Sequence, residues 1–253
     1  MLYTAERSNE KSTSDNPIVQ RHIFAYEQAL TFIKGHALEV GCGEGYGSKM
    51  LRPQADQYTA LDKFEALNKE NLAGIEFKQM NVPPFKGLMD NTYDVAVSFQ
   101  VIEHIEEDNL FIKEIHRVLK PGAKLVLTTP NIKMSLTRNP YHVREYTWQE
   151  LEAKLKKYFS KVELKGIFGD KKAMEYFEQN KASVKKFTRF DVFNLQYLLP
   201  RSVLRIPYDI ANRMNRLKLQ KENGGLVNEI SAQNFYLEQA GENCFDLFAV
   251  CEK

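Results

Sequence analysis

The fold is decided by residues His36–Ser48, HALEVGCGEGYGS. In this stretch a short apolar run, Ala37–Val40, leads into glycines at every second position from Gly41 to Gly47. Glycine lets the backbone turn tightly with positive φ and lets a ligand lie close to the main chain. A helix that begins near Ser48 would direct its free N–H groups toward the same place. The stretch therefore predicts a strand, a ligand-binding loop and a helix.

The sequence on both sides of this stretch alternates between strand-like and helix-like segments. A first helix is predicted from Pro17 to Gly35, with Asn16 as its N-cap. Thr147 and Glu150 have the spacing of a capping box for a later helix that runs to about Tyr158. Further strands are predicted at Tyr58–Leu61, Ile75–Met80, Tyr93–Phe99, Lys124–Thr129, Val162–Phe168 and Cys244–Cys251, and a helix at Asp108–Leu119. This order indicates a doubly wound α/β fold whose mostly parallel sheet is covered on both faces.

The composition excludes several classes of protein. The 253 residues suit one large domain, or one domain plus a modest appendage, and a net charge of +2 is too balanced for a general nucleic-acid coat. Three cysteines without a CxxC pair support neither a disulfide framework nor a structural zinc site. The first residues have no apolar signal-peptide core, and no stretch approaches about 18 consecutive apolar residues. We therefore expect a soluble, cytoplasmic protein.

Three regions are expected along the chain. Residues 1–16 are polar and predict a mobile arm. Residues 17–170 and 243–253 form the predicted α/β domain, and residues 171–242 form a mainly helical insert before the last strand. Within the insert, residues 171–222 carry a net charge of +7, which leaves −5 for the rest of the chain. The insert could be a cap that packs its apolar residues on the main domain, a lid over an acceptor site, or a patch that contacts an anionic surface.

The glycine loop does not fit the common phosphate-binding motifs. A dinucleotide fingerprint needs glycine at the sixth position from Gly41, where this chain has Tyr46, and no P-loop lysine follows. Acidic Glu39 suits an ammonium group better than a phosphate. Asp62 lies 21 residues after Gly41, at the end of the second strand, where a carboxylate can accept both hydroxyls of a ribose.

Four segments together resemble class I S-adenosylmethionine-dependent methyltransferases. They are LEVGCGEGYGS, the acid in ALDKF, YDVAVSFQVIEHIEE and HRVLKPGAKLVLTTPN, and the similarity covers roughly residues 20–168 and the final strand. The chain is most similar to the small-molecule enzymes related to quinone-biosynthesis methyltransferases. The resemblance implies a Rossmann-like, seven-stranded sheet in the order 3-2-1-4-5-7-6, with the last strand antiparallel.

The same resemblance implies S-adenosylmethionine as cofactor and assigns residues to its parts. The loop would lie beside the methionine part, Glu39 would organise the loop or meet the amino group, and Asp62 would hold the ribose. Asn81 stands where relatives often have Asp, so an amide oxygen would accept from the adenine without charge. The implied cofactor-binding residues are Glu39, Gly41, Cys42, Gly43, Gly45, Asp62, Lys63 with its neighbour Phe64, Asn81, Val82, Phe99 and Gln100.

His142 is the candidate general base. It lies in PYHVRE, between the fifth strand and the next helix, at the sheet edge where α/β proteins bind ligands. Its unperturbed pKa lets an imidazole take a proton from a hydroxyl near neutral pH. The loop could instead be ordered by internal hydrogen bonds. Arg144 could hold an anionic substrate, whereas the Glu103-His104 pair is interpreted as structural. His142 and Glu145 are too few ligands to indicate a metal, so none is expected.

These features favour methyl transfer to a small-molecule or lipid-linked acceptor, and O-methylation if His142 is the base. A non-catalytic module that keeps the cofactor site is an alternative. A nucleic-acid methyltransferase is a second alternative, although Asn81-Val82-Pro83-Pro84 follows the third strand and not the fourth, so nucleic acid is not the expected partner. A nicotinamide-dependent oxidoreductase is disfavoured by Tyr46 and Glu39. The oligomeric state is not predicted.

Overall fold

A computed structural model describes residues 13–66, 68–189, 191 and 194–253. The predicted arm therefore lies outside the described residues up to position 12. Its last part belongs to the packed structure: Thr13–Asp15 form a short 3-10 helix in which Ser14 and Asp15 are buried. Asp15 forms an ion pair with Arg216 of the insert at 3.0 Å, so this end of the chain contacts the insert.

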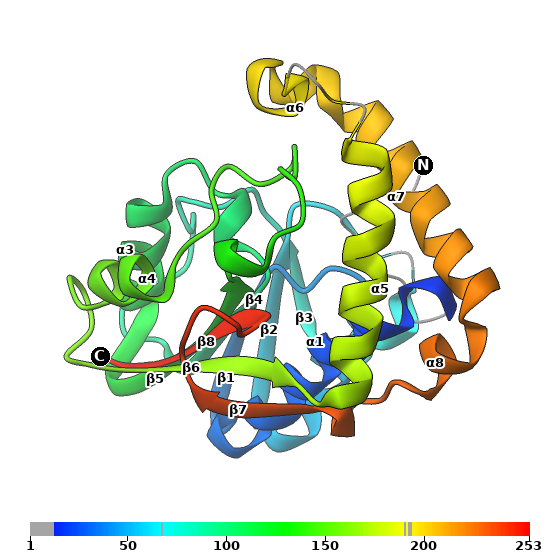
Figure 1. The fold of residues 1–253 in the computed structure, drawn as a ribbon. Coiled ribbons are helices and arrows are strands. Elements are labelled where there is room, and N and C mark those ends of the chain that lie inside the picture. Colours follow the sequence, from blue (N-terminus) through cyan, green and yellow to red (C-terminus); the bar gives the residue numbers. More distant parts are fainter. Residues whose placement is uncertain (1–12, 67, 190, 192–193) are drawn as a thin grey trace.

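The centre of the molecule is one sheet of eight strands (Figure 1). The strands are β1 (His36–Val40), β2 (Gln57–Asp62), β3 (Glu76–Gln79), β4 (Tyr93–Phe99), β5 (Leu119–Pro130), β6 (Lys161–Gly169), β7 (Phe235–Gln239) and β8 (Asp246–Glu252). Their order is β3-β2-β1-β4-β5-β8-β6-β7. Neighbours from β3 to β5 are parallel, and β8 is antiparallel to both β5 and β6.

The seven predicted strands have the expected order, but the prediction of seven strands is wrong. The eighth strand is β7, which pairs antiparallel with β6 at the edge of the sheet. Its apolar run is only three residues long, Phe235 to Leu237, and only Phe235 is buried, as befits a strand at the edge of the sheet. More than 60 residues separate β7 from β6, so no tight turn marks the pair as a hairpin either.

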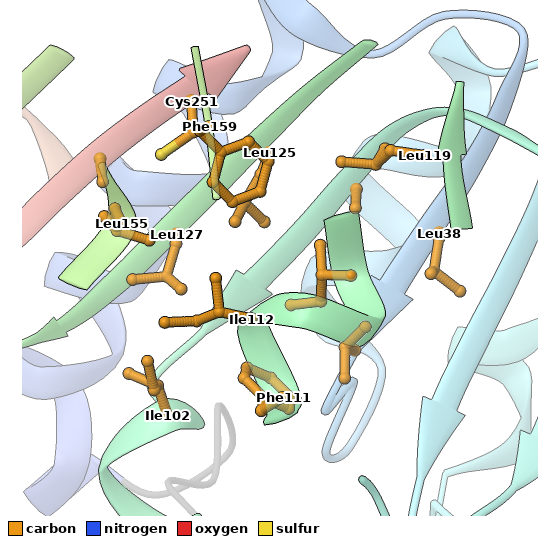
Figure 2. Close-up of a cluster of buried hydrophobic side chains, with 14 of the residues drawn as sticks. Leu38, Ile102, Phe111, Ile112, Leu119, Leu125, Leu127, Leu155, Phe159 and Cys251 are labelled. Atoms are coloured by element: carbon orange, nitrogen blue, oxygen red, sulfur yellow. The ribbon is translucent and has the colours of Figure 1, made fainter. Parts of the chain in front are cut away.

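Helices cover both faces of the sheet. They are α1 (Asn16–Ala29), α2 (Tyr46–Leu51), α3 (Asp108–Val118), α4 (Trp148–Leu155), α5 (Lys171–Thr188), α6 (Leu195–Leu198), α7 (Arg201–Glu222) and α8 (Gly224–Glu229). Successive side chains of β5 point to opposite faces of the sheet and pack in different hydrophobic clusters. Leu125 and Leu127 pack with α3 and α4, where Figure 2 shows them beside Ile112. Val126 packs in a second core with α1 and α2. Two buried faces explain why the central strand β4 is apolar over most of its length.

The ends of two helices test the predicted caps. The Thr147–Glu150 capping box is confirmed, and α4 ends at Leu155, earlier than expected. The prediction of Asn16 as the N-cap of α1 is wrong, because the helix begins at Asn16 and Asp15 precedes it. The Asn16 amide instead donates to the carbonyls of Val227 and Ile230 at 2.7 and 2.8 Å. This side chain therefore joins α1 to the end of the insert.

The insert between β6 and β8 consists of α5 to α8 and β7, with α5 and α7 side by side (Figure 1). Its short helix α6 exposes Tyr197 and Leu198 by 61% and 74%, so these side chains do not pack on the main domain. Phe190, Val192 and Phe193 lie outside the described residues. Over the described ranges, no helix is both long enough and apolar enough to cross a membrane.

Candidate functional site

The glycine loop and the end of β2 form one hydrogen-bonded unit. The amides of Gly41 and Cys42 donate to the Leu61 carbonyl at 2.7 and 3.1 Å. The Asp62 carboxylate then accepts from the Gly43 amide at 2.9 Å and, through its other oxygen, from the Phe64 amide at 2.9 Å. A carboxylate oxygen can accept more than one hydrogen bond, so holding the loop is compatible with Asp62 also accepting hydroxyl groups. The loop is therefore arranged before any ligand arrives.

Two glycines of this stretch serve different purposes. Gly43 has a φ of 55°, and no atom lies within 4 Å of the place where a Cβ would stand, so this part of the main chain is open to a ligand. A Cβ on Gly47 would lie 1.9 Å from the ring of Tyr26. Gly47 is thus required for the packing of α1 on α2. The alternating glycines thus combine an open stretch of main chain at Gly43 with a packing contact at Gly47.

Glu39 is buried beneath this loop and accepts three hydrogen bonds. The donors are the hydroxyls of Tyr26 at 2.9 Å, Ser48 at 2.5 Å and Tyr58 at 2.9 Å. Burial raises the pKa of Glu39, and these donors oppose that rise. The carboxylate thus connects α1, α2 and β2, and its role toward the cofactor stays a prediction.

The other residues predicted to bind the cofactor follow the carboxyl ends of neighbouring parallel strands. Lys63 and Phe64 are exposed after β2, with the Lys63 ammonium 5.0 Å from the Phe64 ring centroid. Asn81 is exposed after β3 and Val82 is half-buried. Phe99 ends β4 with its ring 4.7 Å from that of Tyr26. Because parallel strands end at the same edge of a sheet, the fold brings these residues together with Gly43 and Asp62.

Gln100 lies at the turn after β4 and connects this edge with the next part of the site. It has a φ of 56°, and its backbone N–H donates to the Thr128 carbonyl at 3.0 Å. Its side chain lies beside Asp246, the buried first residue of β8, which forms an ion pair with Arg21 at 2.8 Å. Burial raises the pKa of Asp246, while Arg21 and Gln100 oppose that rise.

A cavity of about 670 Å³ lies between the main domain and the insert. Its walls come from α1, the segment between β5 and α4, α5 and α7. Aromatic and aliphatic side chains contribute much of the lining, among them Tyr176, Phe177, Leu204 and Tyr208. Arg21 lines this cavity as well. Since Arg21 pairs with Asp246 and Asp246 contacts Gln100, these three side chains connect the cavity with the carboxyl edge of the sheet. The volume suits a small organic acceptor.

His142 lines the cavity with its imidazole held on both sides. Nδ1 lies 2.6 Å from Oε1 of Glu145, and Nε2 lies 2.9 Å from Nδ2 of Asn139. The Asn139 oxygen accepts from the Tyr141 amide at 3.0 Å, which fixes the orientation of the Asn139 side chain. Asn139 therefore donates to Nε2, and the ring proton of the neutral imidazole lies on Nδ1, facing Glu145. This arrangement places the basic lone pair on Nε2.

Glu103, His104 and His142 offer ligand atoms that all lie within 4.8 Å of one another, as in a metal site. Several of these atoms already form hydrogen bonds. Glu103 is buried and accepts from the Thr129 hydroxyl at 2.9 Å, and Nδ1 of His104 lies 3.2 Å from the Tyr141 carbonyl. A metal ion would have to replace part of this network, and the absence of a metal stays a prediction.

Arg144 is not part of the cavity lining, and its charge is paired. Its guanidinium forms an ion pair with Asp108, which also accepts from the Tyr146 hydroxyl at 2.7 Å and pairs with Lys154 at 2.9 Å. These contacts make Arg144 part of the packing between α3 and the loop before α4, and argue against the interpretation that it holds an anionic substrate.

Sequence reasoning missed Asn139, Arg21 and Asp246. The only signal for Asp246 is a charged residue that begins an otherwise apolar strand, DLFAV. Arg21 and Asp246 meet only after the sheet has formed, since most of the chain lies between them.

Comparison with known proteins agrees with this geometry. A family model described as a methyltransferase domain matches residues 21–171. A probable S-adenosylmethionine-dependent methyltransferase of Mycolicibacterium smegmatis is 34% identical over 157 residues, which cover 58% of this chain and 61% of the relative. A ubiquinone biosynthesis O-methyltransferase of Xanthomonas oryzae pv. oryzae is 27% identical over 123 residues, 46% of this chain and 50% of the relative. The chain thus spans about 61% or less of the length of these relatives.

The fold has solved counterparts. A structure of a SAM-dependent methyltransferase from Archaeoglobus fulgidus superposes with a TM-score of 0.55 at 12% identity, over 94% of both chains. At that identity the likeness concerns the fold alone. The family match covers more than half of the chain and includes the glycine loop, Asp62 and the strands that position them. The chain belongs to the methyltransferase-domain family.

Proposed function

We propose that this protein transfers a methyl group from S-adenosylmethionine to a hydroxyl of a small-molecule or lipid-linked acceptor. The observation that carries the proposal is the contact between Gly43 and Asp62. It combines open space above a glycine main chain with a carboxylate at the end of β2. A nucleoside whose ribose is held by Asp62 can extend along the glycine loop without meeting a side chain there.

S-adenosylmethionine supplies a methyl group that its positively charged sulfur already activates. The protein must therefore place the acceptor oxygen in line with that methyl and keep water away. The cavity under the insert supports this role, because α5 and α7 form walls over the end of the main domain. We assign residues 171–242 as the acceptor-binding cap of the enzyme.

O-methylation is the finer part of the proposal, and His142 supports it. The lone pair on Nε2 faces a donor, Asn139, that an acceptor hydroxyl can replace. On the other side of the ring, Glu145 stabilises the imidazolium that forms when Nε2 takes the proton. One of the relatives is by its name an O-methyltransferase of ubiquinone biosynthesis, which favours the same reaction class.

Calorimetric titration with S-adenosylmethionine, S-adenosylhomocysteine and NAD⁺ tests the cofactor. We expect both sulfur nucleosides to bind and NAD⁺ not to bind. Asp62→Ala should weaken binding by about 10- to 100-fold, because hydrogen bonds to a carboxylate are lost. Asp56→Ala, which removes an exposed carboxylate just before β2, is the matched control.

Binding of NAD⁺ alone would overturn the proposal. Binding of the sulfur nucleosides without methylation of any phenolic or lipid-linked hydroxyl acceptor would instead favour a non-catalytic module. Salt-dependent binding to RNA or DNA would favour a nucleic-acid substrate.

A further inference from the structure

Helix α7 has apolar side chains on two faces. The inner face lines the cavity through Leu204 and Tyr208. A second row of exposed side chains, here called the outer stripe, lies on the opposite side. The outer stripe consists of Val203, Ile206, Ile210, Met214 and Leu217. Their spacings of three and four residues place them along one side of the helix. Ile206 is 71% exposed, so none of the described residues covers this part of the stripe.

More exposed apolar side chains lie on α6, which precedes α7 directly in the chain. Figure 1 shows α6 at the far end of α5 and α7, away from the sheet. Leu195, Tyr197 and Leu198 of α6 are all exposed there. Large apolar surfaces exposed together on a folded protein indicate a binding surface, whereas single exposed residues need no explanation.

Basic residues flank the outer stripe. At 100° per residue, Arg213 lies on one side of the row and Lys218 on the other, and Lys221 follows Leu217 at the end of the helix. Among the described residues, Lys218 pairs with Glu222 on the same helix at 4.0 Å. These residues belong to the segment 171–222 with its net charge of +7. An apolar row bordered by basic side chains is the pattern of a helix that lies in a membrane interface.

Charge decides between the two occupants that an apolar stripe could accept. A second copy of this chain would bring the same basic segment to the contact, and the two would repel each other. A bilayer with anionic headgroups attracts the basic border and takes up the apolar row. With 22 residues, α7 is about 33 Å long, enough to lie along a surface. We propose that α6 and the outer stripe of α7 bind the surface of an anionic lipid bilayer.

This surface goes beyond the proposed function, because it needs no cofactor and no reaction. If the proposed function is also correct, the two faces of α7 have a joint meaning. The outer stripe would rest on the bilayer while Leu204 and Tyr208 line the acceptor cavity on the other side of the same helix. The protein would then take an amphiphilic acceptor directly from the lipid phase.

Vesicle flotation of the full chain without cofactor tests the proposal. One set of vesicles contains equal parts of phosphatidylcholine and phosphatidylglycerol, and the other contains phosphatidylcholine alone. We expect binding to the anionic set only, and weaker binding as salt is added. The double variant Arg213→Glu with Lys218→Glu should partition about tenfold more weakly or worse. Ile206→Ser with Ile210→Ser should have a similar effect through lost apolar contact.

Matched controls separate the surface from general charge. Lys113→Glu with Lys157→Glu changes the net charge equally, on exposed positions of α3 and after α4. Met89→Ser removes an exposed apolar side chain outside the insert. Both controls should keep vesicle binding. Thermal unfolding of every variant shows whether the fold is kept.

Equal binding to both vesicle sets, no binding, or equal loss in the controls would overturn the proposal. So would a concentration-dependent dimer that the Ile206 and Ile210 changes dissociate, because the stripe would then belong to a second copy. Calorimetric binding of S-adenosylhomocysteine by the same samples keeps the two proposals apart. A chain that binds the nucleoside but no vesicles contradicts only the membrane surface, and the reverse result contradicts only the cofactor assignment.

Discussion

His142 shows how much of the chemistry depends on single contacts. Its ring is held between Glu145 and Asn139, so one nitrogen carries the proton and the other presents a lone pair at the cavity wall. Glu145 also accepts from the Ser135 hydroxyl, which fixes the carboxylate in turn. In the proposed mechanism Glu145 and Asn139 would be positioning residues, and His142 would be the group that meets the acceptor.

Replacing His142 by Asn is expected to lower kcat for a hydroxyl acceptor by about 10²- to 10⁴-fold, the usual effect of losing a general base. Cofactor affinity should not change, because His142 lies outside the glycine loop. Methyl transfer measured with radiolabelled cofactor, beside calorimetry, checks both parts. His116→Asn, on α3 against Phe159, is the control. An unchanged kcat would remove His142 from the mechanism.

On the proposed cofactor side, the sequence pattern singles out residues that the fold places at one edge of the sheet. On the proposed acceptor side, the pattern does so only in part. Gly43 and Asp62 belong to a local pattern, a glycine loop after one strand and an acid at the end of the next. Asn139 and Asp246 had no such pattern. Their roles depend on which partner the folded chain brings next to them. Asp246 at the start of β8, for example, pairs with Arg21 of α1.

At the scale of secondary-structure elements, the close contact of α1 with α2 determines where the glycine loop lies. Tyr26 of α1 packs its ring on Gly47 and donates its hydroxyl to Glu39. The loop is therefore held from below by a helix that precedes it in the chain. This contact was not predicted, because a glycine that only leaves room for a distant ring looks the same in sequence as one that binds a ligand.

Gly47→Ala is expected to destabilise the protein by about 1–3 kcal/mol, since the new Cβ would overlap the Tyr26 ring. Chemical denaturation measures the change. Gly241→Ala places a Cβ in open space and serves as the control. Equal stability of the two variants would contradict the packing role of Gly47.

Glu114 of α3 predicts a dependence of stability on pH. It accepts from the Phe85 amide at 2.9 Å and pairs with Arg117 at 2.8 Å, and this pairing lowers the pKa of Glu114 below the ordinary 4.5. The unfolded chain then binds the proton more readily. The stabilisation is therefore present above about pH 4.5 and is lost as the pH falls further, toward the lower pKa of the folded state.

Thermal unfolding of wild type and Glu114→Gln across this range gives the measurement. The wild type should be more stable at neutral pH, and the difference should shrink as the pH falls below 4.5. Glu70→Gln, at an exposed position, should not reproduce this convergence. A difference that persists unchanged into acid would contradict the assignment.

For the whole molecule, the sheet order joins the two halves of the site. Parallel strands β1 to β4 bring the cofactor residues to one edge, and β8 brings Asp246 to the cavity. Hydrophobic periodicity predicted that strands exist, but their order came from the family resemblance, because periodicity does not say which strands are neighbours. The edge strand β7 lay outside that resemblance and was missed.

Ligand binding should stabilise the whole fold if the cofactor site is built into the sheet. S-adenosylhomocysteine at about 100 times its dissociation constant should add about 2.7 kcal/mol to the free energy of unfolding. Differential scanning calorimetry should therefore show a higher Tm for wild type. At the same ligand concentration Asp62→Ala, which is expected to bind about 10- to 100-fold more weakly, should gain only about 0.4–1.4 kcal/mol and show a clearly smaller shift. A Tm of wild type that does not respond to the ligand would contradict the proposed cofactor.

The position of β8 has a consequence for how the protein is made. It is the last strand in chain order, yet it lies inside the sheet between β5 and β6. During synthesis on the ribosome, β6 lacks its β8 neighbour until residues 246–252 have emerged. The ion pair between Arg21 and Asp246 cannot form before then either. The sheet can therefore not be completed step by step as the chain grows. A stalled or shortened chain that lacks β8 would expose two strand edges and be a substrate for chaperones or proteases.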